Sequence, residues 1–163
     1  MLSLYLPLLG LTFLGLNVDS ASPYNIRPVG TSSDREYRLR MYHTHTNERL
    51  DVIYRRGNAY VPEGLDRLNR FLRDSRTAEV HPYDPKVFDL LHDLETVVGR
   101  PNAELQIVCG YRTPRTNEYL RANTGGVAKT SRHMRAEAID IRLPGTATAR
   151  LRDAALNLKR GGV

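Results

Sequence analysis

Cysteine is almost absent from this chain, because Cys109 is the only one among its 163 residues. A single cysteine excludes an intramolecular disulfide, so the fold does not depend on an oxidising compartment. Cys109 closes the apolar run Leu105 to Cys109, which favours a buried thiol on a strand. A nucleophilic role would need a histidine placed to deprotonate the thiol, and no sequence pattern indicates one.

Tryptophan is missing and phenylalanine occurs only three times, so few aromatic rings are available to stack on bases. The net charge is +6, from 24 Lys and Arg against 18 Asp and Glu, and such a charge attracts polyanions. No nucleic-acid motif accompanies it, and the arginines are scattered through predicted helices and turns. We therefore expect no nucleic-acid partner. A basic surface or nucleic-acid-binding domain stays an alternative that fits the charge.

No apolar run is long enough for a comfortable membrane span, which needs about 20 residues. The uncharged run Leu2 to Leu16 is shorter and is interrupted by one proline and two glycines. It is typical of the apolar region of a signal peptide, with Val18 and Ser20 at the −3 and −1 positions of a cleavage site. The basic residues that usually precede such a run are missing.

These signals divide the chain into three parts. Residues 1–20 are expected to be a signal peptide or N-terminal anchor, and residues 21–36, rich in Ser, Pro, Asn and Gly, are expected to be a linker. Residues 37–163 are long enough for one compact domain. The leader predicts an exported protein of the periplasm or cell envelope, without a stable membrane span.

Within residues 37–163, strand and helix signals follow one another without a regular βαβ repeat, which predicts an α+β domain with helices packed on a small antiparallel sheet. The predicted elements are a hairpin of strands 39–42 and 50–54, helices opening at Pro62 and after Asp84, a strand over 105–109, a helix from Pro114 to about Asn123, a strand around 139–141, and a final helix capped by Thr146.

The segment 109–144 carries the pattern S-x-H-x-x-A-x-A-x-D, formed by Ser131, His133, Ala136, Ala138 and Asp140. The apolar residues around the aspartate predict a buried strand, with the histidine on the loop that enters it. A neutral imidazole and a carboxylate held by separate elements suit zinc, provided that one position stays open for water. The alternative is a core histidine that is hydrogen-bonded to a strand aspartate.

A second histidine pair, His43 and His45, lies in the predicted hairpin, and residues two apart on a strand face one side of a sheet. This spacing is compatible with metal ligands, but a structural or surface role is the simpler interpretation.

The segments GYRTPRTN, GGVAKTSRHM and AEAIDIRLPG resemble the murein endopeptidase MepK (YcbK) family, which is related to the VanX/VanY D-Ala-D-Ala peptidases and shares the Hedgehog/DD-peptidase fold. The resemblance extends from about Arg38 to Val163. It implies that His133 and Asp140 are zinc ligands, that Ser131 is the serine opening the motif, and that Arg112 is directed at the substrate.

The resemblance also implies features that this sequence lacks. The family's third zinc ligand is a histidine in a later strand, which we expect beyond Val163 together with the general base. Loss of that strand predicts an unpaired edge on its neighbour. Ala136 stands where the family has glycine, so a positive φ there would strain the backbone. Glu137 is not nominated as a base, because strand alternation points it away from Asp140.

The sequence therefore predicts a zinc-dependent murein endopeptidase that cleaves peptide cross-links, with peptidoglycan stem peptides and cross-links as partners. As given, the chain is expected to be an incomplete, inactive form. A non-catalytic remnant that binds peptidoglycan peptides is the other alternative.

Overall fold

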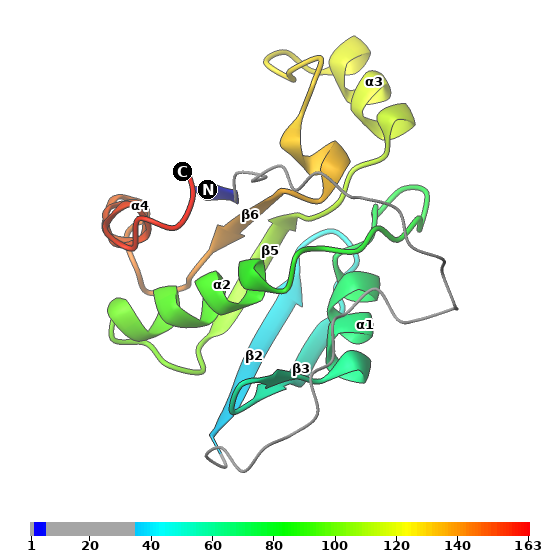
Figure 1. Cartoon of the computed structure of the whole chain (residues 1–163). Helices are drawn as coiled ribbons and strands as arrows, with labels where there is room; N and C mark the ends of the chain where they lie inside the picture. Colours follow the sequence, from blue (N-terminus) through cyan, green and yellow to red (C-terminus); the bar gives the residue numbers. More distant parts are fainter. Residues whose placement is uncertain (1, 6–34) are drawn as a thin grey trace, which may run out of the picture.

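The computed structural model describes residues 2–5 and 35–163 and shows one mixed sheet covered by helices (Figure 1). The strands have the order β1-β6-β5-β2-β3-β4. The strands are β1 (Leu2–Tyr5), β2 (Glu36–His43), β3 (Arg49–Arg56), β4 (Ala59–Tyr60), β5 (Glu104–Cys109) and β6 (Ala138–Arg142). The helices are α1 (Pro62–Phe71), α2 (Lys86–Val97), α3 (Pro114–Asn123), the short 3-10 helix η1 (Arg132–Arg135) and α4 (Thr148–Asn157).

The predicted α+β class is confirmed, with one difference in the sheet. The hairpin of β2 and β3 is antiparallel as predicted, with Asn47 in the left-handed conformation at its turn. β2 and β5, however, are parallel, so the sheet is mixed. The connection between these strands contains two helices, and a crossover of this length allows a parallel return. Both strands therefore end at the same edge of the sheet.

Most of the helices start where the sequence predicted. Pro62 opens α1, and the side chain of Thr113 caps α3 by accepting from the amide of Thr116. Asp84 accepts from the amide of Lys86 at the start of α2. The predicted cap at Thr146 is wrong, because its amide donates to the carbonyl of Leu143 in a turn and α4 begins two residues later.

The core lies between the sheet and three helices. α1 packs on β3, α2 on β2, and α4 on β1. Figure 1 shows α3 and η1 apart from these helices, at the end of the sheet that β5 reaches. The apolar stripes predicted for α1 and α2 are buried, as Leu65, Leu68, Leu91 and Leu94 show. This arrangement leaves the ends of β2 and β5 free to form a site.

The outer edge of β6, the strand that carries Asp140, is paired with β1. Ser3 stands opposite Asp140, and Leu2 and Leu4 stand opposite Ile141 and Ile139. Leu2 and Leu4 are buried, which fits the alternation of a strand with one face on a core. The cleavage site at Val18 and Ser20 and most of the predicted linker lie outside the described residues. No helix in the described ranges is long and apolar enough to cross a membrane.

Candidate metal centre

Three side chains of metal-ligating types meet where β5, η1 and β6 converge. They are Cys109, His133 and Asp140, whose candidate ligand atoms all lie within 4.8 Å of one another. His133 and Asp140 are 7% and 6% exposed, so the pair is buried. In the described part of the chain, no other group of three or more His, Cys, Asp or Glu side chains has this geometry. The structure therefore brings together the two zinc ligands predicted from the sequence.

The imidazole of His133 has a fixed orientation. Its Nδ1 lies 2.9 Å from the carbonyl oxygen of Gly110. Because a carbonyl oxygen only accepts, Nδ1 carries a proton, and Nε2 faces the site, where loss of its own proton would free a lone pair for a metal. A metal-binding histidine commonly makes such a contact, since it sets both the tautomer and the ring plane.

Gly110, whose carbonyl contacts His133, follows β5 directly and lies very close to Leu72, the residue after α1. A Cβ at Gly110 would lie 2.5 Å from the carbonyl oxygen of Leu72, which is closer than real Cβ atoms approach. The amide of Tyr111 donates to the same carbonyl at 2.8 Å. Glycine is thus required at this point of the GYR segment.

The distance between His133 and Asp140 favours a shared cation. Nε2 lies 3.4 Å from Oδ1 of Asp140, whereas a direct ionic hydrogen bond is usually about 2.7–2.9 Å long. Bonds of about 2.0–2.1 Å at a tetrahedral zinc place two nitrogen or oxygen ligands about 3.4 Å apart. The pair thus has the separation of two ligands on one ion, and the His/Asp donor set fits zinc.

The pKa shifts of His133 and Asp140 also indicate that this site favours a positive charge beside the carboxylate. Burial opposes charging of His133, but its contacts with the acceptor groups of Asp140 and Cys109 raise its pKa to about 10. Burial alone would raise the pKa of Asp140, yet the hydrogen bond and charge of His133, with Ser3 and Arg112, hold it below its usual value. The site therefore stabilises a carboxylate beside a cation, which a metal ion or a proton can supply.

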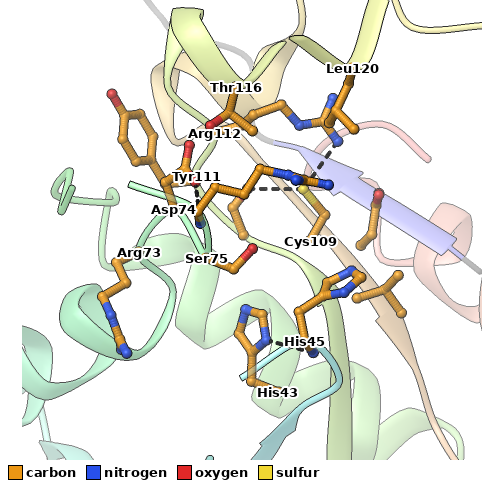
Figure 2. Close-up of a pocket in the computed structure, with 14 residues that line it drawn as sticks. His43, His45, Arg73, Asp74, Ser75, Cys109, Tyr111, Arg112, Thr116 and Leu120 are labelled. Carbon is orange, nitrogen blue, oxygen red and sulfur yellow. Dashed lines mark hydrogen bonds between the residues drawn. The ribbon is translucent and has the colours of Figure 1, made fainter. Parts of the chain in front are cut away.

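An open cavity of about 430 Å³ gives access to this centre. Figure 2 shows side chains around it from the end of β2, from the segment after α1 and from the GYR segment. Cys109 and Asp140 are among the lining residues, with His43, His45, Arg73, Tyr111 and Arg112. The cavity is thus formed where the parallel strands β2 and β5 end.

Arg112 lies in the cavity wall, as the resemblance implied. Its Nη2 lies 3.2 Å from the sulfur of Cys109, and its Nη1 lies 3.3 Å from Oδ1 of Asn117. Its backbone amide donates to the carbonyl of His133 at 3.1 Å. The guanidinium group has no carboxylate partner closer than 4.0 Å among the salt bridges of the described residues. It is therefore placed to meet an anionic or polarised group in the cavity.

The other motif residues have clear places. Ser131 immediately precedes η1 and is not among the residues lining the cavity, so its catalytic role stays a prediction. Ala136 has φ 51 and ψ 36, the left-handed conformation that made glycine the expected residue. Glu137 pairs with Arg135 at 2.7 Å and does not line the cavity, in agreement with its omission as a base.

Sequence analysis missed three contributors to the cavity. It assigned Cys109 to the core, although the sulfur reaches the metal centre. It treated His43 and His45 as structural or surface residues, but both line the cavity. His43 is buried against Phe71, and its Nδ1 accepts from the amide of His45 at 3.2 Å. The parallel pairing of His43 with Ile107 brings this strand end beside the GYR segment, which no local pattern indicates.

Asp74, on the segment after α1, holds the cavity wall together. It is 1% exposed, and its Oδ2 accepts from the amide and the hydroxyl of Thr113 at 2.7 and 2.8 Å. Its Oδ1 accepts from the amide of Arg76 at 2.8 Å. These bonds outweigh burial and lower its pKa. With both oxygens engaged, Asp74 is a structural residue, although it borders the cavity.

The fold and the centre describe an α+β domain of the metallopeptidase kind, and comparison with known proteins identifies the family. Residues 31–163 match the family described as peptidoglycan L,D-endopeptidase MepK. The chain belongs to this family of peptidases, which confirms the resemblance seen in the sequence. No solved structure matches the chain.

Individual relatives agree with the family match. A protein of Haemophilus influenzae named probable peptidoglycan L,D-endopeptidase MepK is 37% identical over 118 residues, which are 72% of this chain and 63% of that protein. The peptidoglycan L,D-endopeptidase MepK of Escherichia coli K12 is 37% identical over 132 residues, 81% of this chain and 72% of that protein. The chain thus spans about two thirds of the length of these relatives.

Proposed function

We propose that this protein is a zinc-dependent murein endopeptidase that hydrolyses peptide cross-links of peptidoglycan. The observation that supports it best is the buried pair of His133 and Asp140, 3.4 Å apart at the end of an open cavity. The names of the relatives supply the substrate class, peptidoglycan.

In this proposal His133 and Asp140 hold the metal through Nε2 and a carboxylate oxygen. Zinc, when bound, polarises a carbonyl group and makes a water molecule more acidic. Gly110 keeps the imidazole in the tautomer that binds metal, because its carbonyl retains the proton on Nδ1. The resemblance implies a third, histidine ligand and a general base, and the proposal assigns neither to a residue of this sequence.

Arg112 acts on the substrate in this proposal. Its guanidinium group lies in the cavity wall beside the metal pair and can donate two parallel hydrogen bonds to a carboxylate or to a carbonyl that gains negative charge. Stem peptides of peptidoglycan carry carboxylates, so a basic wall suits this substrate. The same chemistry requires export to the periplasm or cell envelope. Because Leu2–Tyr5 form β1 beside β6, the N-terminal segment would have to be retained as an anchor and not removed as a signal peptide.

The test is digestion of purified murein sacculi with zinc added, followed by separation of the released muropeptides. We expect cleavage by protein extended with the coding sequence downstream of Val163, and much slower cleavage by residues 1–163. His133→Ala and Asp140→Ala should lose bound zinc, measured by atomic emission, together with activity. His92→Ala, on α2, is the matched control and should retain both.

Two outcomes would contradict the proposal. Unchanged zinc content in His133→Ala would exclude the ligand assignment. Binding of stem peptides without cleavage by the extended protein would instead favour the peptidoglycan-binding remnant.

A further inference from the structure

The β5 strand carries one extra residue beside the metal centre. Ile107 pairs with Ile141, but Cys109 pairs with Asp140, so Val108 has no counterpart on β6. Directly opposed residues of an antiparallel pair project from the same face, and a bulge changes which side chain does so. Without the extra residue, Val108 would stand opposite Asp140. The bulge therefore brings a sulfur atom, in place of an isopropyl group, to the carboxylate.

The sulfur is close enough to share an ion with the other two side chains. The ligand atoms of Cys109, His133 and Asp140 lie within 4.8 Å of one another. Bonds of about 2.3 Å to sulfur and 2.0–2.1 Å to nitrogen or oxygen place the ligands of a tetrahedral zinc about 3.4–3.6 Å apart. Binding all three to one ion would require atoms that lie up to 4.8 Å apart to approach each other by about 1 Å.

The surroundings of Cys109 suit a coordinated sulfur. Arg112 places Nη2 3.2 Å from Sγ, which compensates the negative charge that a coordinated thiolate carries. Cys109 is only partly buried and lines the cavity, so an ion entering the cavity can reach it. A thiol that only filled the core would need neither the positive charge of Arg112 beside it nor exposure to the cavity.

We propose that Cys109 is a protein ligand of the metal, so that this chain holds a Cys/His/Asp site. The inference rests on the proposed function in one respect, the presence of a divalent metal at His133 and Asp140. Three protein ligands leave the fourth position of a tetrahedral zinc open for water or substrate. With the histidine ligand that the family resemblance implies as well, the site would have four protein donors, and water or substrate would enter as a fifth ligand, an expansion that catalytic zinc can undergo. Sulfur, imidazole and carboxylate together favour zinc over magnesium or calcium.

Cobalt(II) is the probe for this proposal, because it replaces zinc and gives an intense near-ultraviolet charge-transfer band when bound to a thiolate. Cys109 is the only cysteine, so such a band has one source in the protein of residues 1–163. We expect the band to appear at one cobalt per chain. Cys109→Ser should abolish it while retaining the weaker visible bands of cobalt held by His133 and Asp140.

Zinc affinity gives a second readout. Loss of an outer-shell partner typically weakens metal binding by about 10–100-fold, so loss of a direct ligand in Cys109→Ser should cost more than about 100-fold. Met134→Leu, on the same η1 turn as His133, is the control and should leave the affinity within about threefold.

The results separate the two proposals. One result would overturn the role of Cys109 and leave the proposed function standing. In it, the unsubstituted protein shows visible cobalt bands but no sulfur band, and His133→Ala loses the visible bands. Absence of cobalt or zinc binding at one ion per chain, in residues 1–163 and in the extended protein alike, would overturn both. The spectrum of the unsubstituted protein decides the matter even if Cys109→Ser fails to fold.

Discussion

His133 and Gly110 hold the two halves of the centre together. Nδ1 of His133 lies 2.9 Å from the carbonyl oxygen of Gly110, and the carbonyl of His133 accepts from the amide of Arg112 at 3.1 Å. Residues far apart in the sequence thereby fix each other: the end of β5 orients the imidazole, and η1 orients the backbone that carries the arginine. The following four predictions concern this centre and the fold that supports it.

Replacing Arg112 with lysine should impair catalysis more than folding. Lysine keeps the charge but loses the planar pair of donors, so kcat/KM on isolated muropeptides should fall by at least about tenfold. The hydrogen bond of Arg112 to Asn117 is long, 3.3 Å, and the sulfur of Cys109 is a weak acceptor, so the free energy of unfolding should change by less than about 1 kcal/mol. Arg115→Lys, exposed on α3, is the control. A sharp drop in melting temperature with retained activity would indicate a structural role.

Ala136 should tolerate glycine but not valine. The left-handed backbone at φ 51 costs an alanine about 1–2 kcal/mol, which glycine would relieve. Two effects oppose this relief and destabilise the glycine variant. The lost burial of the methyl group costs about 0.8 kcal/mol, and the greater entropy of the unfolded chain costs about 0.4–1 kcal/mol. These effects nearly cancel, so Ala136→Gly should lie within about 1 kcal/mol of the parent in urea unfolding.

Valine at position 136 is β-branched, at a positive φ and in a buried site, so it should destabilise the protein by at least about 2 kcal/mol. Equal unfolding midpoints for the valine and glycine variants would show that the left-handed conformation does not hold in solution.

Glu95 should make stability fall as pH rises. It is 1% exposed on α2, and burial raises the pKa of its carboxyl from 4.5 to about 8, with partial opposition from the amide of Asn102. Between these two values the folded protein keeps a proton that the unfolded chain releases, so the free energy of unfolding decreases with increasing pH. The decrease should be on the order of a few kcal/mol from about pH 5 to about pH 8.

Glu95→Gln should reduce this dependence and raise stability near pH 8, measured by urea unfolding at both values. The raised pKa of His133 leaves a smaller decrease above pH 6.5. Glu118→Gln, exposed on α3, should keep the slope of the parent. A parent whose stability increases over this range would exclude the buried neutral carboxyl.

Leu4 should contribute to stability as a core residue. It is 1% exposed in β1 and stands opposite Ile139 of β6, so Leu4→Ala should cost about 2–5 kcal/mol. Leu156→Ala, at a residue 51% exposed on α4, is the matched control and should cost less than about 0.5 kcal/mol. If the two variants have equal unfolding midpoints, β1 does not pack on β6 in solution, and the β6 edge should then promote association at high concentration.

Much of the fold was predictable because its signals are local. Pro62 and the Thr113-Pro114 pair mark helix starts through backbone geometry and capping, and both were placed correctly. Alternating apolar residues located the β2–β3 hairpin and β6. The cap at Thr146 failed because the turn around Gly145, at φ 78, delays the helix by one residue, so that Ala147 occupies the N-cap position.

The sequence by itself determined the identity and spacing of His133 and Asp140, since a short turn followed by a buried strand fixes where both side chains lie. Only the tertiary structure decided what surrounds them. A bulge at Val108 turned Cys109 toward Asp140, the parallel pairing of β2 with β5 brought His43 into the cavity wall, and β1 occupied the edge of β6. Each of these depends on register between strands distant in the sequence, and register is set by packing across the whole sheet and not by any local pattern.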